Sequence, residues 1–292
     1  ASEAASSDQK QEIKGLSGVS REIDMIKLND RLQIIAERLK DEKTMADIGT
    51  DHGFLPVFLL QSGQCDRVIL ADISVPSLAK AEENCSRYFT GEECAACAEF
   101  RVGDGLTVLK PGEVDAVVIA GVGGKLITEL LERDMEHTCS FRKYVFQPRI
   151  GQGILRKWLC DHGFHIIHED LVKEGHFIPE IITALSPETA GSADEKKDPV
   201  SCLTEDILAC ASESERQMGI FYQIPPWIVS AGGPGEGFLL RMLKREQSVL
   251  EQIMMSKERN RASEEIRCDN IYYLKDLLRQ VRERGAMCDG AK

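Results

Sequence analysis

The 292-residue sequence has no apolar run long enough to cross a bilayer, and 29% of its residues are charged. It also lacks the basic start and apolar stretch of a secretory signal, because residues 1–11 are small and polar. We therefore expect a cytoplasmic chain without membrane contact, in which residues 1–20 form a flexible leader.

Paired metal-ligand motifs are missing as well. The ten cysteines are spread over a chain much longer than a small disulfide framework, and the one close pair, Cys94 and Cys97, has no second Cys or His pair nearby. We expect reduced thiols and no metal site. Nothing in the sequence indicates an obligatory protein partner.

The sequence also has no excess of basic residues. The formal net charge is -12, which argues against a protein that coats nucleic acid through clustered Lys and Arg. The charge is uneven, however, because residues 230–292 contain 12 Lys and Arg against 10 Asp and Glu. A polyanionic partner would therefore have to meet a local basic face in this part of the chain.

Apolar periodicity predicts an alternation of strands and helices. Strands are predicted over residues 44–48, 67–72, 99–102, 114–120 and 144–146, and helices over residues 28–39, 54–61, 74–88, 126–131 and 154–160. Residues 164–171 and 177–185 are predicted to pair as an antiparallel hairpin at one edge. The fold class is thus α/β, with a mostly parallel sheet covered on both faces and a ligand at the carboxyl ends of its strands.

The last third of the chain has a different pattern. Residues 186–199 are predicted to be a mobile insertion, and residues 203–218 a helix. Beyond residue 239, apolar residues at helical spacing predict two long amphipathic helices that are joined near residues 261–268 and form an antiparallel pair. We expect one domain over residues 21–229 and a helical domain over residues 230–292.

Two acids stand at the loop after the first parallel strand. Asp47 lies near the end of the strand, and Asp51 lies between Gly49 and Gly53. It is not a Gly-x-Gly-x-x-Gly loop, and a carboxylate beside a pyrophosphate would be repulsive. The same carboxylates would favour an ammonium or a sulfonium group, which selects S-adenosylmethionine over a dinucleotide. A further acid, Asp72, ends the next strand about 20 residues on, where it can accept hydrogen bonds from ribose hydroxyls.

The third strand ends at another glycine-rich turn, in which Asp104 stands between Gly103 and Gly105. A carboxylate at this point can lie near the edge of an adenine ring. The nucleoside end of the cofactor is therefore predicted at the second and third strands, and its methionine end at the first loop.

Several strings in the sequence resemble one family, the bacterial tRNA (adenine-22-N1)-methyltransferases, which are class I S-adenosylmethionine enzymes with a C-terminal coiled-coil extension. The resemblance covers residues 28–180 and continues more loosely from residue 232. It is carried by the motifs LNDRL (28–32), ADIGTDHGFLP (46–56), GVGG (121–124), QP (147–148) and LRKWL (155–159). It implies a Rossmann-like methyltransferase sheet, methyl transfer to N1 of an adenine in tRNA at position 22, and RNA binding by the helical extension.

The resemblance also implies a set of site residues. The catalytic candidates are Asp51, His52 and Phe54, the last of which would stack on the extruded base. Cofactor-binding candidates are Arg31, Asp47, Gly49, Asp51, Asp72, Ile73, Gly103, Asp104, Gly105 and Gly121. Substrate-binding candidates are Phe54, Gly123, Gln147 and Arg149.

Other interpretations of these residues stay open at this point. Asp51 could orient the methionine ammonium rather than accept a proton from the exocyclic amine of the base, and His52 could donate to a loop carbonyl. Asp47 could cap a turn, Asp72 could cap a helix, and Arg31 could be a surface cation.

The sequence departs from the family pattern at three positions. The family usually has Tyr where Phe54 stands, Met where Val122 stands and Asn where Arg149 stands. Phe54 can stack but cannot donate a hydrogen bond. The alternatives are therefore methylation of another tRNA or RNA base, or binding of cofactor and RNA without turnover.

Overall fold

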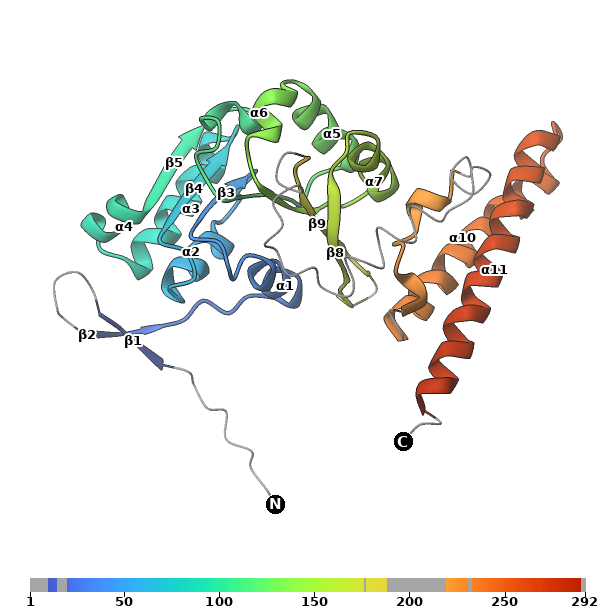
Figure 1. The fold of residues 1–292 in the computed structure, drawn as a ribbon, viewed down its shortest axis with the longest axis horizontal. Helices are drawn as coiled ribbons and strands as arrows, with labels where there is room; N and C mark the ends of the chain where they lie inside the picture. Colours follow the sequence, from blue (N-terminus) through green and yellow to red (C-terminus); the bar gives the residue numbers. More distant parts are fainter. Residues whose placement is uncertain (1–9, 15–19, 176, 188–218, 231–232, 290–292) are drawn as a thin grey trace, which may run out of the picture.

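A parallel sheet with an antiparallel edge organises the protein (Figure 1). The computed structural model describes residues 10–14, 20–175, 177–187, 219–230 and 233–289. Its seven-stranded sheet has the order β5-β4-β3-β6-β7-β9-β8. The strands are β3 (Thr44–Ile48), β4 (Arg67–Asp72), β5 (Ala98–Val102), β6 (Ala116–Ala120), β7 (Lys143–Gln147), β8 (His165–Leu171) and β9 (Glu180–Leu185). Strands β3 to β7 are parallel, and β9 is antiparallel to both β7 and β8, which confirms the predicted fold class.

Helices cover both faces of this sheet because its buried side chains alternate between two cores. Met45 packs in one core with α1 (Asp30–Arg38), α2 (Phe54–Gln61) and α3 (Val75–Tyr88). Its neighbour Ala46 packs in the other with α5 (Gly124–Glu132) and α7 (Gln152–Asp161). The Asn29 side chain caps α1 by accepting a hydrogen bond from the Leu32 backbone N–H.

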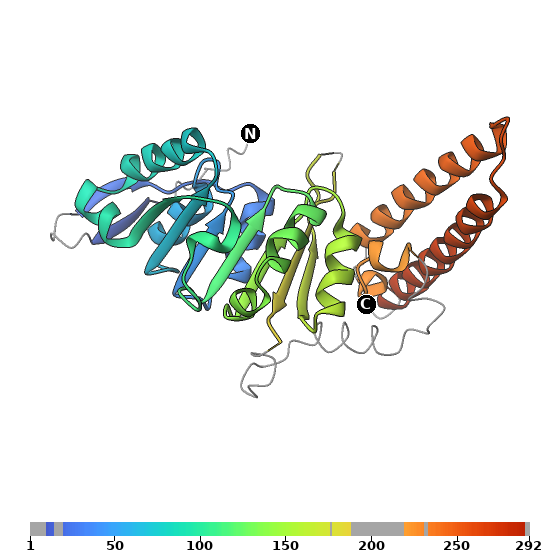
Figure 2. The same cartoon turned by 90° about the horizontal axis from the view of Figure 1, so that it is seen from above.

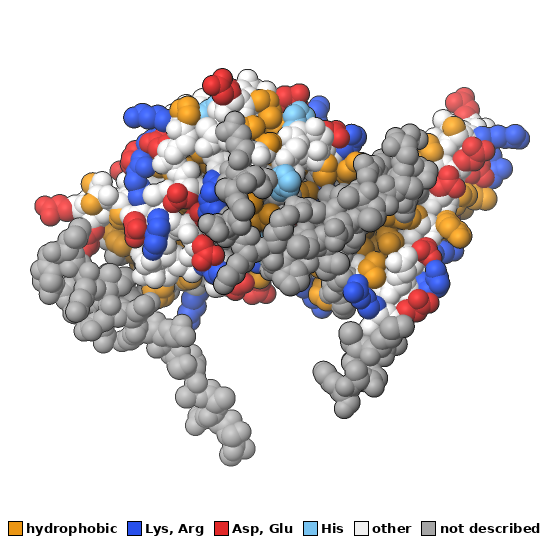
Figure 3. Space-filling view, in the orientation of Figure 1, with side chains coloured by type: hydrophobic (Ala, Val, Ile, Leu, Met, Phe, Trp, Pro, Cys, Tyr) orange, Lys and Arg blue, Asp and Glu red, His pale blue; other side chains and the backbone are white. Residues whose placement is uncertain are grey.

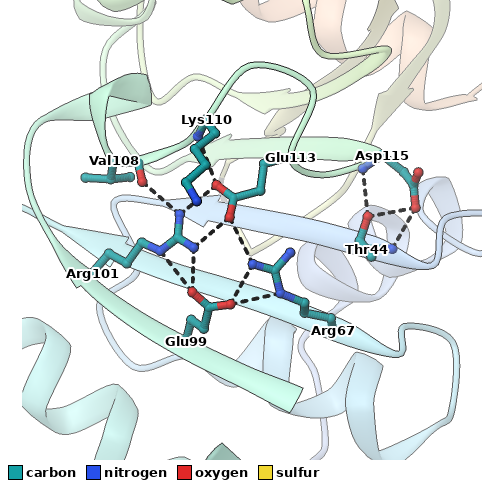
Figure 4. Close-up of polar contacts among 8 residues, drawn as sticks. All are labelled: Thr44, Arg67, Glu99, Arg101, Val108, Lys110, Glu113 and Asp115. Atoms are coloured by element: carbon teal, nitrogen blue, oxygen red, sulfur yellow. Dashed lines mark hydrogen bonds and ion pairs between the residues drawn. The ribbon is translucent and has the colours of Figure 1, made fainter. Parts of the chain in front are cut away.

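The edge of the sheet opposite the carboxyl ends is held by two polar clusters (Figure 4). In one, Arg101 donates to Glu99 and Glu113, and Arg67 donates to the same two carboxylates. In the other, Asp115 Oδ2 accepts from the Thr44 backbone N–H and hydroxyl, both at 2.8 Å. The hydrogen bonds from Arg101 hold the pKa of the Glu113 carboxyl well below its usual range. These contacts fix β3, β4, β5 and β6 at the end remote from the loops.

The sequence analysis did not predict two strands near the N-terminus and two short helices. Strand β1 (Lys10–Lys14) lies within the expected leader and pairs antiparallel with β2 (Ser20–Asp24). Their sequences, KQEIK and SREID, are mostly polar, so they give no strong strand signal. The short helices α4 (Gly91–Cys97) and α6 (Met135–Cys139) were also missed. The predicted insertion (186–199) and the predicted helix (203–218) lie almost wholly outside the described residues.

The C-terminal helices α10 (Gly233–Met255) and α11 (Arg261–Asp289) pack side by side and extend away from the β8 edge of the sheet (Figure 2). Their junction falls at residues 256–260, so the predicted junction at 261–268 is wrong. Asn260 explains the shift, because its side chain and carbonyl accept from the Ser263 and Glu264 backbone N–H groups and start α11. Buried Glu246 on α10 accepts hydrogen bonds from Arg267 and Asn270 on α11.

The core of this helical unit reaches beyond α10 and α11. Ile220, Ile224 and Ile228 are buried in it, next to the 3-10 helices η2 (Phe221–Gln223) and η3 (Ile228–Ser230). Leu171 and Ile178 of the β8–β9 hairpin pack against the same cluster. The helical pair is therefore seated on the hairpin by apolar contact.

Candidate functional site

The loops that follow the parallel strands meet at one edge, and all of the predicted site residues except Arg31 stand in these loops or at the ends of the strands and helices that they join. Gly49 and Thr50 donate their N–H groups to the Ala71 carbonyl, and Gly103 donates to that of Asp72. On the other side, Gly121 donates to the Gln147 carbonyl. These hydrogen bonds define two groups of loops. The first group follows β3, β4 and β5, and the second follows β6 and β7.

The first loop is shaped by glycines. Gly53 has φ +66°, and a Cβ atom there would lie 2.8 Å from the Leu70 side chain and 3.0 Å from Ala81 of α3. Gly49 has φ +83°, and its Cβ would meet no atom within 4 Å. Gly53 is thus required by close packing, whereas Gly49 turns the chain beside open space that a ligand can use.

Two carboxylates, Asp47 and Asp72, lie at this loop on neighbouring strands. Burial raises the pKa of half-buried Asp47 to about 6, and the charge of nearby Asp72 adds to the effect. Asp72 Oδ1 accepts from the Ser74 backbone N–H at 2.6 Å, while Ser74 itself caps α3. Burial and the nearby charge both disfavour the ionised form of Asp47. A cationic ligand would stabilise this carboxylate.

Apolar side chains stand exposed beside these acids. Ile73 follows β4 with 72% of its side chain exposed, and Val102 ends β5 with 56% exposed. Two apolar surfaces at adjacent strand ends can enclose a flat heteroaromatic ring such as adenine. Ile73 was predicted in the site, whereas Val102 was not, because an apolar residue at a strand end has no signal that separates it from core.

Asp104 and Asp51 have partners in the structure. Arg133 Nη1 lies 2.5 Å from Asp104 Oδ2, so a ligand at this turn would share the carboxylate with a guanidinium. Asp51 is exposed, with Lys80 Nζ at 3.5 Å from Oδ1 and His52 Nε2 at 3.3 Å from Oδ2. Asp51 is therefore exposed to solvent and also contacts Lys80 of α3.

His52 and Phe54 form an aromatic surface at the start of α2. Their rings stack with centroids 5.3 Å apart and an interplanar angle of 17°. The His52 carbonyl accepts from Asn84 Nδ2 at 2.8 Å, so its backbone is fixed to α3 while its ring stays exposed. Such a surface offers a stacking face to a planar base.

The second group of loops contains the remaining candidates. The Arg31 guanidinium of α1 donates to Gln147 Oε1, and its Nε lies 3.8 Å from Glu174 Oε1. Gly124 brings α5 against the loop after β7, since a Cβ there would lie 2.2 Å from the Gly151 carbonyl oxygen. Gly121 and Gly123 are half-buried, and Arg149 is exposed. Arg31 thus lies at the β7 side of the site, where its predicted contact with the cofactor stays a prediction.

Among the described residues, no three His, Cys, Asp or Glu side chains are grouped to hold a metal ion. Within the same residues, no helix is long and apolar enough to cross a membrane.

A family model described as a methyltransferase domain matches residues 28–182, which span the sheet and the loops just described. The chain belongs to this family. A tRNA (adenine(22)-N(1))-methyltransferase of Bacillus subtilis is 27% identical over 255 residues, with 87% of this chain and 98% of the relative covered. The methyltransferase assignment is therefore supported along almost the whole length of both chains.

Solved structures agree. The crystal structure of the B. subtilis m1A22 tRNA methyltransferase TrmK is similar with a TM-score of 0.70 and 25% identity, covering 87% of this chain and 99% of that one. TrmK of M. capricolum, in complex with S-adenosylhomocysteine, shares the fold with a TM-score of 0.62 at 21% identity over 87% and 99% of the chains. The resemblance seen in the sequence motifs is confirmed.

Proposed function

We propose that the protein transfers a methyl group from S-adenosylmethionine to N1 of an adenine in tRNA, the adenine at position 22. The observation that carries the proposal is the stacked, exposed His52–Phe54 pair beside a glycine-turned loop lined by Asp47 and Asp51. An aromatic surface receives a base, and carboxylates receive a cationic cofactor. The proposal also draws on the printed function of the B. subtilis relative.

The residues of the first group of loops fit this cofactor. Asp47 and Asp51 would face its ammonium and sulfonium end, Gly49 and Gly121 would leave room for it, and Asp72 would accept from the ribose hydroxyls. Ile73 and Val102 would enclose the adenine, and Gly103 and Gly105 would shape the turn that holds Asp104 near the adenine edge. When bound, S-adenosylmethionine supplies an electrophilic methyl group on sulfur.

The chain's own task in the reaction is alignment. Adenine N1 has a lone pair in the plane of the ring, so the site has to hold that plane in line with the methyl group and exclude water. Phe54 and His52 would set the plane by stacking, while Gln147, Gly123 and Arg149 would hold the edge of the base. The methylated ring becomes cationic as the N–C bond forms and the S–C bond breaks, and Asp51 would stabilise this charge or accept a proton from the exocyclic amine.

The division of labour between the two parts of the chain follows from the same proposal. Residues 21–229 would perform the reaction, and residues 230–292 would hold the tRNA. The proposal includes a cytoplasmic location, with tRNA as the partner and neither a membrane nor an obligatory protein partner.

The test is incubation with bulk tRNA and methyl-labelled cofactor, followed by mass spectrometry of the nucleosides. We expect labelled 1-methyladenosine among the nucleosides, and mass spectrometry of nuclease fragments of the same tRNA should place it at position 22. A different labelled nucleoside would overturn the choice of base, which matters because Phe54, Val122 and Arg149 differ from the family pattern. Tight tRNA binding with no labelled product would favour a binding protein without turnover.

A further inference from the structure

The turn between β8 and β9 lies at the ligand edge of the sheet. In the register of β7 with β9, Phe146 faces Ile182, so the start of β9 lies next to the carboxyl end of β7. The turn precedes β9 and therefore extends past the edge where the loops meet. Two backbone hydrogen bonds join Glu174 and Phe177 in this turn: the Glu174 N–H donates to the Phe177 carbonyl at 3.0 Å, and the Phe177 N–H donates to the Glu174 carbonyl at 2.8 Å.

The turn is held from two sides. Glu174 Oε1 lies 3.8 Å from Arg31, and Arg31 donates to Gln147 at the end of β7. On the other side, Ile178 packs in the cluster that seats α10 and α11. Figures 1 and 2 show the β8–β9 hairpin between the parallel strands and the helical pair. A tRNA that reaches both parts has to pass this turn.

Phe177 differs from the rest of the turn because the residue is 77% exposed although its backbone N–H and carbonyl are both hydrogen-bonded to Glu174. A single exposed apolar residue is ordinary on a protein surface. Here, however, the residue belongs to a turn at the ligand edge of the sheet, and Glu174 of this turn is linked through Arg31 to Gln147 at the end of β7.

We propose that Phe177 is a positioning residue that inserts into the tRNA stack and occupies the place left by the extruded adenine. This inference rests on the proposed function. His52 and Phe54 would hold the base inside the site, whereas Phe177 would stabilise the helix that the base has left. Apolar wedges between base steps are a general means of offsetting the cost of unstacking.

The test uses full-length protein with Phe177→Ala, Phe177→Trp and the neighbouring Lys173→Ala, and a tRNA with 2-aminopurine at position 22. Fluorescence at saturating protein reports extrusion of the base without any methyl transfer. We expect Phe177→Ala to lose most of the fluorescence rise and Phe177→Trp to keep it. Lys173→Ala removes a charge from the same turn and should change the tRNA affinity but not the amplitude.

Single-turnover methylation separates a wedge from a general defect. We expect Phe177→Ala to slow methylation of unmodified tRNA about 10- to 100-fold. The same variant should slow methylation less than about 3-fold when the tRNA has an abasic residue next to the target adenine, because the stack at that site is already open. The S-adenosylmethionine affinity should stay at the wild-type value. Equal slowing on both tRNAs, or a wild-type fluorescence rise in Phe177→Ala, would overturn the wedge. Absence of 1-methyladenosine from the wild-type reaction would instead overturn the proposed function, and the wedge with it.

Discussion

Asp47 is the site residue whose ionisation the fold alters most clearly. Its pKa is raised to about 6 by burial and by the charge of Asp72. In the unfolded chain the pKa is about 3.9, so the folded protein holds this proton more strongly and loses stability as the pH rises between these values. A bound sulfonium or ammonium would reverse the balance, because it favours the carboxylate.

The affinity for S-adenosylmethionine should therefore fall as the pH drops below about 6. Asp47→Asn should weaken binding about 10- to 100-fold at pH 7.5, the loss expected for a charge-assisted hydrogen bond. It should also abolish the pH dependence below pH 7. Titration calorimetry between roughly pH 5 and pH 7.5 measures both effects. A variant with the same pH profile as the wild type would remove Asp47 from the cofactor site.

Asp51 poses a different question, since its role could lie with the cofactor or with the base. It forms an ion pair with Lys80 and lies 3.3 Å from His52 Nε2, and all three side chains are exposed. Exposed pairs contribute little to stability, so Asp51→Ala should stay folded while its activity falls. Lys80→Ala removes the same ion pair but keeps the carboxylate, which makes it the matched control.

The cofactor affinity and the single-turnover rate of Asp51→Ala together distinguish a role in binding the cofactor from a role in contacting the base. Loss of S-adenosylmethionine affinity with an unchanged single-turnover rate at saturation would assign the acid to the cofactor. Loss of the rate with unchanged affinity would assign it to the base. Turnover equal to that of the wild type would contradict any essential role for Asp51.

At the scale of elements, α7 connects the loop after β7 to the C-terminal unit. Arg156 on α7 is fully buried; it donates to Glu169 of β8, to Glu180 of β9 and to the Tyr222 carbonyl of η2. A Cβ on Gly153 would lie 3.0 Å from the Gln223 backbone nitrogen, so η2 approaches α7 closely. Two glutamates share one arginine, and burial raises the pKa of Glu180 to about 7 despite the attraction of Arg156.

This cluster predicts a pH dependence of stability. The pKa of Glu180 is above its unfolded value of about 4.3, so its contribution to the free energy of unfolding is greatest below that value and falls as the pH rises towards 7. Glu180→Gln keeps an acceptor for Arg156 and removes the surplus charge. We expect it to be more stable than the wild type at pH 7.5 by on the order of 1–2 kcal/mol, with no difference near pH 4.5.

Urea denaturation at the two pH values measures this difference. Arg156→Met is the contrasting variant, because it leaves both glutamates buried without a cation and should lose about 3–5 kcal/mol at pH 7.5. A Glu180→Gln variant that is as destabilised as Arg156→Met would mean that the attraction to Arg156 outweighs burial.

The elements show what the sequence could and could not reveal. Strands β3 to β7 were predictable because each is a short run that contains apolar residues, and Asp47, Asp51 and Asp72 became candidates because they stand at the end of such a run or in the loop after it. Arg156 was predicted only as part of the helix over residues 154–160, since nothing local reveals that Glu169 and Glu180 converge on it. Val102 was missed because an apolar residue at a strand end resembles a core residue, and Glu174 and Phe177 were missed because only the pairing of β9 with β7 brings their turn to the ligand edge.

For the whole molecule, the proposed function requires a chain of net charge -12 to hold tRNA. The face drawn in Figure 3 shows Lys and Arg mixed with Asp and Glu along the helical pair rather than one patch of a single sign. Several cations there are already paired: Arg279 with Asp276 and Glu283, and Arg282 with Glu236. Deleting the helices would be a poor test, because Leu171 and Ile178 of the hairpin would lose the apolar cluster that covers them.

Charge variants of the full chain test the tRNA contact without that defect. Lys244 and Arg245 are exposed on α10, and the double variant Lys244→Ala with Arg245→Ala should weaken tRNA binding and reduce the slope of log affinity against log salt concentration by about 1–2. Arg279→Ala is the comparison, and it should change the slope less because Asp276 and Glu283 already neutralise its charge. Filter binding over a salt series gives the slopes, and calorimetry should show unchanged S-adenosylmethionine affinity. If neither variant changed the slope, α10 and α11 would serve the fold rather than the tRNA, since counterions released by a bound phosphate backbone must appear in the salt dependence.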